Sequence, residues 1–153
     1  MNLPKIKILG LTAFAFFLLC SPRWAETFTP ILVIEAENAT IKTVGEAIDG
    51  GWCLSSNGIL GEDVYIPAAR TYEVVVRAYG EPLGGIWPLM ALSVDGVAGE
   101  PVTVGSGVYI DYSFQVALAP GVHLIGVSFL NDAYNPGVED RNLYLDKFTI
   151  ASL

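Results

Sequence analysis

The sequence has few basic side chains, one histidine and two cysteines, and each shortage excludes a class of function. Among its 153 residues, 8 are Lys or Arg and 16 are Asp or Glu, so the formal net charge is −8. This charge argues against nucleic acid and anionic membrane surfaces as partners, because binding phosphate depends on basic side chains. The only histidine, His123, lies on an expected strand with no Ser or Cys motif nearby. A structural histidine is therefore favoured over a catalytic one.

Stretches with helical periodicity are almost absent from residue 29 onward, where short alternating segments are separated by Gly, Pro and Asn. With 52% hydrophobic residues, the chain can bury a core. The pattern predicts an all-β fold, a β-sandwich (jelly roll) of two antiparallel sheets. The expected strands are 31–36, 39–44, 51–54, 59–66, 71–79, 88–95, 101–104, 108–118, 121–130 and 143–150.

Two of these segments carry more specific predictions. In 71–79, the period of two places Tyr72, Val74, Val76 and Ala78 on one apolar face. The segments 108–118 and 121–130 are separated only by Ala119 and Pro120, and they predict a hairpin.

The first residues are typical of a secretory signal. Lys5 and Lys7 precede an apolar run of about thirteen residues, which is shorter than the run of about twenty that spans a bilayer. We expect cleavage after Ala25, so residues 1–25 form the signal peptide and residues 26–153 form one secreted domain, without a membrane segment. Lipidation at Cys20 is the less favoured alternative, because Leu19 is larger than the residue that normally precedes a lipidated cysteine.

Cleavage would leave 5 basic and 16 acidic side chains, a net charge of −11, and Cys53 as the single cysteine. An internal disulfide is then excluded, and Cys53 is expected to be a small buried apolar residue. An exported domain this acidic suits divalent cations.

The segment 131–142 is expected to be a loop at one end of the sandwich, and it is rich in side-chain oxygens. Calcium takes six to eight oxygen ligands, typically from carboxylates, carbonyls and Asn side chains. An EF-hand is excluded, because Tyr134 and Leu143 occupy the third and twelfth positions counted from Asp132. A solvated polar loop without metal is the alternative. The oxygen-bearing candidates are Asn131, Asp132, Glu139, Asp140 and Asn142.

Acidic residues also occur in the first and last strands. The period of two places Glu35 and Glu37 with Ile31 and Val33, and Asp146 with Tyr144, Phe148 and Ile150. Because an unpaired buried carboxylate costs several kcal/mol, these acids need a partner. A calcium ion that joins the two strands is one such partner, and pairing with Lys42 or Lys147 is the alternative.

Three segments resemble the calcium-dependent xylan-binding carbohydrate-binding modules of families thirty-six and sixty. They are 84–96 (GGIWPLMALSVDG), 111–123 (DYSFQVALAPGVH) and 131–146 (NDAYNPGVEDRNLYLD), and the last is the most specific. The resemblance implies a structural calcium and a second calcium that two adjacent sugar hydroxyls chelate directly. Position by position, it places the sugar-binding ion on Asp132, Glu139 or Asp140, with Asn131, Asn142 and a loop carbonyl assisting. It places the structural ion on Glu35, Glu37 and Asp146.

The expected partner is xylan or a related plant β-glycan, and Ca²⁺ is the expected cofactor. Trp87 and Tyr134 lie in expected loops, where an aromatic ring can stack on a sugar, although either residue also suits a core. Two alternatives stay open from the residues. One is a small secreted glycoside hydrolase, which needs only two suitably spaced carboxylates, and the other is an adhesion or structural domain that calcium stabilises.

Overall fold

The computed structural model describes residues 30–153, so the predicted signal peptide and Cys20 lie outside the described residues. No helix among the described residues has the length and apolar character needed to cross a membrane. The strands and the single 3₁₀ turn are β1 (Pro30–Glu35), η1 (Ala36–Asn38), β2 (Ile41–Lys42), β3 (Glu46–Ile48), β4 (Gly51–Leu54), β5 (Gly58–Ile66), β6 (Arg70–Glu81), β7 (Leu89–Val94), β8 (Val97–Ala98), β9 (Val102–Thr103), β10 (Ile110–Leu118), β11 (Gly121–Phe129), β12 (Tyr134–Asn135), β13 (Glu139–Asp140) and β14 (Asn142–Ser152).

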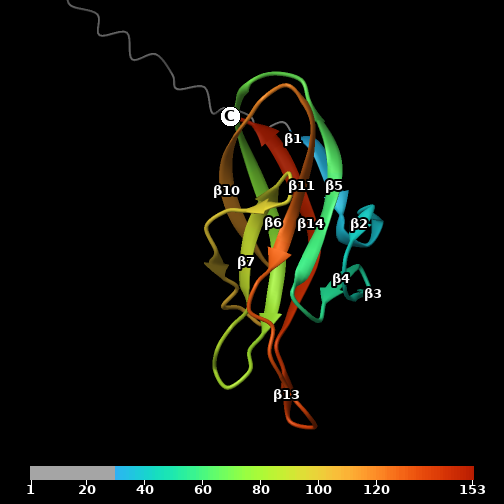
Figure 1. The fold of residues 1–153 in the computed structure, drawn as a ribbon, viewed down its shortest axis with the longest axis vertical. Coiled ribbons are helices and arrows are strands. Elements are labelled where there is room, and N and C mark those ends of the chain that lie inside the picture. Colours follow the sequence, from blue (N-terminus) through green and yellow to red (C-terminus); the bar gives the residue numbers. More distant parts are fainter. Residues whose placement is uncertain (1–29) are drawn as a thin grey trace, which may run out of the picture.

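Two antiparallel sheets pack face to face, as the alternating pattern predicts (Figure 1). The first sheet has the order β10-β6-β14-β4-β3, and β1 also pairs with β14. The second has the order β2-β5-β11-β7-β8, and β9 also pairs with β7. The last strand, β14, therefore pairs with three other strands, β1, β4 and β6, and lies in the middle of the first sheet.

The core lies between the sheets, and burial follows the period of two clearly along β6. Tyr72, Val74, Val76 and Ala78 of β6 are all fully buried, which confirms the apolar face expected for this segment. They pack in one cluster with side chains of the opposite sheet, among them Ile125 and Val127 of β11.

Cys53 is buried as well, on β4 opposite Tyr144 of β14. Its burial raises the pKa of the thiol to about 11. This environment confirms the interpretation of Cys53 as a buried structural residue.

The predicted hairpin between 108–118 and 121–130 is wrong. β10 pairs only with β6 in the first sheet, whereas β11 lies between β5 and β7 in the second. Ala119 and Pro120 thus form an arch that crosses from one sheet to the other. Residues 67–69 form a second arch from β5 to β6 at the same end, because Gly121 pairs with Ile66 and Leu118 pairs with Arg70. The crossing places β11 between β5 and β7 in the second sheet and leaves β10 at the edge of the first.

The face predicted for Asp146 is also partly wrong. The pairing of β14 with β6 shifts register between Leu145 and Lys147, which marks a bulge. Phe148 and Ile150 point into the core, while Asp146 lies half-buried near Arg77 on the outer face. A bulge reverses the alternation of faces, and the sequence pattern alone does not show where it occurs.

Candidate metal and sugar site

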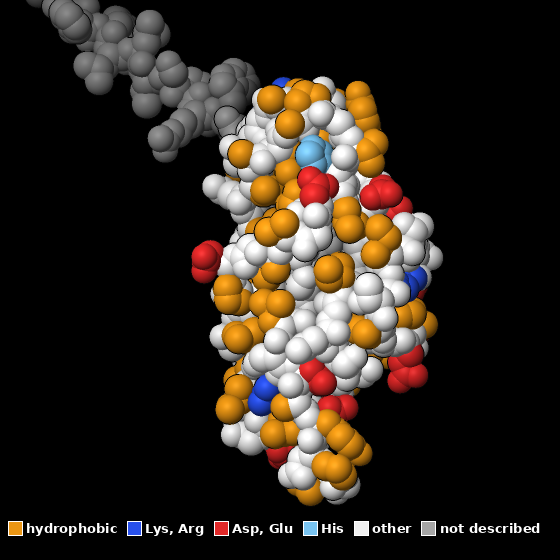
Figure 2. Space-filling view, in the orientation of Figure 1, with side chains coloured by type: hydrophobic (Ala, Val, Ile, Leu, Met, Phe, Trp, Pro, Cys, Tyr) orange, Lys and Arg blue, Asp and Glu red, His pale blue; other side chains and the backbone are white. Residues whose placement is uncertain are grey.

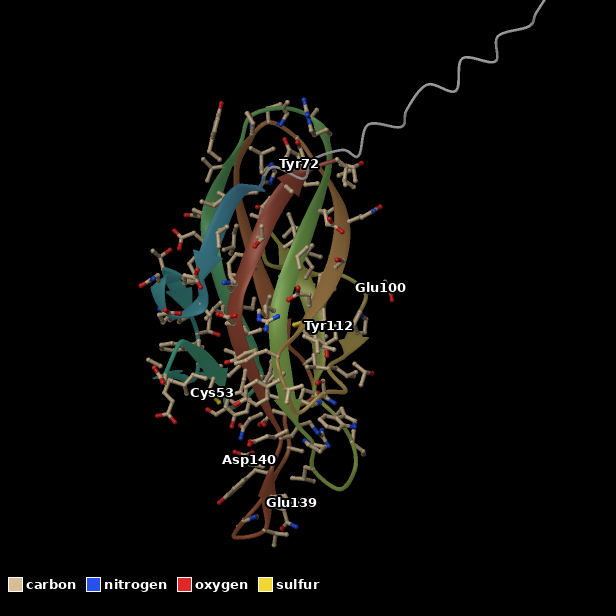
Figure 3. The ribbon with its side chains drawn as sticks, turned by 180° about the vertical axis from the view of Figure 1, so that it is seen from behind. Cys53, Tyr72, Glu100, Tyr112, Glu139 and Asp140 are labelled. Atoms are coloured by element: carbon tan, nitrogen blue, oxygen red, sulfur yellow. The ribbon has the colours of Figure 1, made fainter. Side chains whose placement is uncertain are left out.

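The segment 131–142 forms a small hairpin, and its strands fix which side chains share a face. Pro136 and Gly137 occupy the turn, where Gly137 has a φ of +74° and Val138 N donates to Asn135 O at 3.0 Å. Tyr134 pairs with Asp140, and Asn135 pairs with Glu139. Because neighbouring residues of a strand point to opposite faces, Tyr134 and Asp140 share one face and Glu139 projects from the other. The hairpin extends from one end of the sandwich, beside the loop between β6 and β7 (Figures 1 and 3).

Asp132 lies at the base of this hairpin and carries a buried oxygen without a partner. Its backbone N–H donates to Asn57 Oδ1 at 2.7 Å, which anchors the residue, but its own Oδ1 is buried and accepts no hydrogen bond. Burial and, next, the negative charge of Asp140 raise the pKa of Asp132 above its usual range. The negative charges of Asp132 and Asp140 thus repel each other at this end of the sandwich.

Asn142 contributes a second buried oxygen of this kind. The residue is only 9% exposed at the start of β14, and its Oδ1 has no hydrogen-bond partner. Its Nδ2 donates to Glu81 Oε2 at 3.3 Å, and the same oxygen accepts a hydrogen bond of 2.7 Å from Tyr144 OH.

Arg141, between Asp140 and Asn142, is 6% exposed, yet it forms no ion pair among the residues described. Its guanidinium donates instead to three backbone carbonyls. These carbonyls belong to Leu83, Ile86 and Asn131. The charge of Arg141 lowers the pKa of Asp132, although burial and Asp140 outweigh it. Arg141 therefore joins the hairpin to the β6–β7 loop.

Asn131 also serves this junction. Its Oδ1 accepts a hydrogen bond of 2.6 Å from Leu89 N, and its Nδ2 donates to Trp87 O at 3.0 Å. The carboxylate of Glu139 makes a further link from the hairpin, because its Oε2 accepts from Gly84 N at 2.8 Å. The side chains of Asn131 and Glu139 thus form hydrogen bonds with the β6–β7 segment.

The oxygens at this end of the sandwich fit a hard cation. Among residues 30–153, no three His, Cys, Asp or Glu side chains lie close enough together to hold a metal ion. Two carboxylates, Asp132 and Asp140, together with the side-chain Oδ1 of Asn142 would form a site with only two acidic ligands. Calcium accepts such mixed oxygen ligands. The buried, unpartnered oxygens of Asp132 and Asn142 are the observation that supports this fit, because such groups normally have a partner.

The three residues expected to hold a structural calcium have separate environments. Asp146 Oδ2 is 3.1 Å from Arg77 Nε, and Glu35 Oε1 is 3.9 Å from Lys147 Nζ. Glu37 belongs to η1, where its Oε2 is buried without a partner. Pairing of Glu35 with Lys147 is the alternative that the sequence left open, and the structural calcium stays a prediction.

The two aromatic candidates differ in exposure. Tyr134 is 65% exposed on the hairpin, whereas Trp87 is half-buried in the β6–β7 loop. Figure 2 shows hydrophobic side chains over the whole visible face, including its lower, hairpin end. Tyr134, Val138 and Ile86 are among the large exposed apolar residues. Tyr134 is therefore the aromatic residue best placed to contact a ligand beside Asp140.

Sequence reasoning missed Glu81 and Arg141. Glu81 is the last residue of β6 and reads as an ordinary surface acid, and Arg141 reads as a solvated charge in a polar loop. A signal for Arg141 was present, because a single basic residue lies within a segment that carries three carboxylates.

Comparisons with known proteins identify a family and a fold. Residues 73–152 match the family described as Ca-dependent carbohydrate-binding module, xylan-binding (CBM60). Among solved structures, the chain is similar to the CBM36-1 domain of a multidomain xylanase from the hindgut metagenome of Trinervitermes trinervoides, with 16% identity, a TM-score of 0.64, and 80% of this chain and 97% of that chain covered.

A second similar structure is a carbohydrate-binding module CBM36 in complex with calcium and xylotriose, with 19% identity, a TM-score of 0.60 and coverage of 78% and 99%. A third is the module CBM6cm-2 from Cellvibrio mixtus lichenase 5A in complex with cellotriose, with 15% identity, a TM-score of 0.58 and coverage of 82% and 99%. At these identities the structural likeness shows the fold. Among curated proteins, none matches this sequence.

Proposed function

The chain belongs to the family of calcium-dependent, xylan-binding carbohydrate-binding modules, and from this premise we propose that it binds a xylan-like plant polysaccharide, without catalysis, at the hairpin end of the sandwich. Asp132, Asp140 and Asn142 would hold the calcium ion. The observation that carries the proposal is the buried, unpartnered Oδ1 of Asp132 beside the negative charge of Asp140.

Within this site the residues have separate roles. Asp132 and Asp140 supply negative charge, and Asn57 fixes Asp132 through the backbone N–H. Arg141 and Asn131 hold the β6–β7 loop against the hairpin. Bound calcium would supply coordination positions for two adjacent sugar hydroxyls, in place of two waters. Tyr134, on the same hairpin face as Asp140, would cover the sugar ring.

The geometry also favours one of two ligands that the sequence left open. Glu139 is exposed, accepts a hydrogen bond from Gly84 and lies on the opposite hairpin face from Asp140. Asp140 is half-buried and acts electrostatically on Asp132. We therefore assign the ligand role to Asp140 and a loop-holding role to Glu139.

Titration calorimetry with xylohexaose tests the proposal. Binding is expected in millimolar CaCl₂ and is expected to disappear after treatment with EDTA, and Asp140→Asn should abolish it while Glu139→Gln retains it. Undiminished affinity after metal removal would refute chelation. An assay for reducing ends on the same samples should detect no hydrolysis of xylan, and release of sugar would contradict the non-catalytic role.

We also propose that the protein is exported, on the basis of the lysines and apolar run that precede Ala25. Expression of the full chain in a bacterial host, followed by mass spectrometry of the secreted product, tests this. The expected mature chain begins near Glu26, and a product that retains residues 1–25 contradicts the proposal.

A further inference from the structure

One carboxylate oxygen of Glu81 accepts two hydrogen bonds, and neither donor belongs to a basic residue. Oε2 accepts from Asn142 Nδ2 at 3.3 Å and from Tyr144 OH at 2.7 Å. Register places Glu81 directly opposite Asn142, at the point where β6 ends and β14 begins. A strand-to-strand pair therefore fixes the distance between this carboxylate and the amide of Asn142.

An ionised carboxylate accepts hydrogen bonds and donates none, so it can face only the NH₂ end of an Asn amide. Glu81 thereby determines which way the amide of Asn142 points. Its carbonyl oxygen is turned away from Glu81, and in this orientation Oδ1 is buried and has no partner. At 9% exposure of the residue, such an oxygen is costly unless something else binds it.

Tyr144 keeps Glu81 in place. Its ring is stacked on Tyr79, with centroids 4.3 Å apart and planes inclined by 2°, and Tyr109 contacts Tyr79 edge-on at 4.7 Å. The hydroxyl of a ring held in this way is a fixed donor. That hydroxyl donates to Glu81 Oε2, so the stacked ring holds the carboxylate in position.

From these contacts we infer that Glu81 is a positioning residue, which orients the amide of Asn142 so that Oδ1 becomes a calcium ligand. The inference rests on the proposed function, because it assumes that the ion binds beside Asp132 and Asp140. Glu81 acts through Asn142 and does not itself bind calcium. It lies about fifty residues before the hairpin, outside the acidic segment that the sequence marks.

Two substitutions separate orientation from charge. Glu81→Gln and Glu81→Met remove the same negative charge, and the side chains they introduce are similar in length to that of Glu. Both wild-type hydrogen bonds converge on one oxygen, so the amide oxygen of Gln can still accept both, whereas Met can accept neither. Glu73→Met, on the same strand and the same outer face but at its other end, is the matched control for loss of a carboxylate.

The experiment measures calcium affinity of the sugar-free protein by titration calorimetry, with the thermal midpoint of the calcium-free protein recorded in parallel. Glu81→Met should weaken calcium binding about tenfold or more, in the range found when partners of metal ligands are removed. Glu81→Gln and Glu73→Met should change it less than about threefold. In ¹⁵N spectra, addition of calcium should shift the side-chain amide of Asn142 in the wild type and in Glu81→Gln.

Equal affinities for Glu81→Met and Glu81→Gln would overturn the inference, and so would a fall in the thermal midpoint with unchanged calcium affinity, since that result indicates a purely structural role. If Glu81→Met does not fold, Tyr144→Phe provides the second test. It removes one donor to Glu81 and keeps the stacked ring, and it should weaken calcium binding by a smaller factor. Failure of the proposed function looks different, because the wild type itself would then bind no calcium or would bind it equally well after Asp132→Asn.

Discussion

The Nε of Arg141 donates a hydrogen bond of 2.8 Å to the carbonyl oxygen of Ile86, so that a buried guanidinium joins two segments that lie 55 residues apart in the sequence. The other guanidinium nitrogens bind Asn131 O and Leu83 O. The planar fork of an arginine suits several carbonyls at once, which a lysine does not. Arg141 therefore sets the position of the β6–β7 loop relative to the hairpin.

Arg141→Lys should consequently destabilise the protein by about 2 kcal/mol, because it leaves buried carbonyl oxygens without a donor. Urea denaturation in calcium-free buffer measures the change. Arg70→Lys is the control, since Arg70 is exposed at the start of β6 and its replacement should alter stability by no more than about 0.5 kcal/mol. Equal effects of the two substitutions would contradict the role assigned to Arg141.

Asp132→Asn should have opposite effects with and without calcium. Without the ion, it removes a partly buried charge that faces Asp140, so stability should stay the same or rise by about 1 kcal/mol. With calcium at 100 times the dissociation constant, the wild type should gain about 2.7 kcal/mol and the variant far less. Thermal unfolding in EDTA and in CaCl₂ measures both effects. A loss of stability in EDTA would show that the favourable interactions of Asp132, with Ala133 N–H and the charge of Arg141, outweigh its burial and the repulsion from Asp140.

Tyr134→Ala should weaken binding of xylohexaose about tenfold while leaving calcium affinity unchanged, because Tyr134 shares a face with Asp140 and is 65% exposed. Val138→Ala is the matched control on the same hairpin, since Val138 is 70% exposed and lies in the turn region. Calorimetry with the sugar and with calcium alone separates the two properties. A parallel loss in both variants would indicate that the whole hairpin tip contacts the ligand.

The pair of His123 and Asp95 should make stability depend on pH. His123 Nδ1 is 2.8 Å from Asp95 Oδ2, and Nε2 is 3.0 Å from Ala119 O. Both partners are acceptors, so both bonds form only in the charged imidazolium. The hydrogen bond to Asp95 and then that to Ala119 raise the pKa of His123, and the hydrogen bond from His123 lowers the pKa of Asp95.

A raised histidine pKa contributes stability that is complete below its unfolded value of about 6.5 and is lost as the pH rises through the folded value. The lowered pKa of Asp95 contributes stability that is present above its unfolded value of about 4, and this stability is lost as the pH falls through the folded value. The difference in urea midpoint between the wild type and His123→Gln should therefore be largest near pH 5.5 and shrink above about pH 6.5. A difference that is constant from about pH 5 to pH 8 would exclude a charged His123.

Local pattern predicted the two-sheet sandwich well, because alternation along β6 reflects burial directly. It failed where the outcome depends on distant partners. Ala119 and Pro120 look like a hairpin turn, but the sheet that each strand joins depends on pairing with β6 and β5. The bulge at Asp146 likewise reverses side-chain faces without a sign in composition.

The candidate site was predictable to the same extent. The acids of 131–142 lie within one short segment, so the sequence identified Asp132 and Asp140 as candidate calcium ligands. Glu81 comes from another strand, and the sequence did not identify it. The choice between Asp140 and Glu139 required the hairpin register, because residues one apart on a strand point to opposite faces.

The buried thiol of Cys53 offers a built-in reporter of motion at this end of the molecule. Only the thiolate reacts readily with alkylating reagents, and a pKa of about 11 keeps that form scarce at neutral pH. Cys53 is 6% exposed and pairs with Tyr144, whose hydroxyl holds Glu81. Labelling of Cys53 by iodoacetamide then requires this part of the first sheet to open, so a comparison of its rate with and without calcium would test whether the proposed ion stabilises that part.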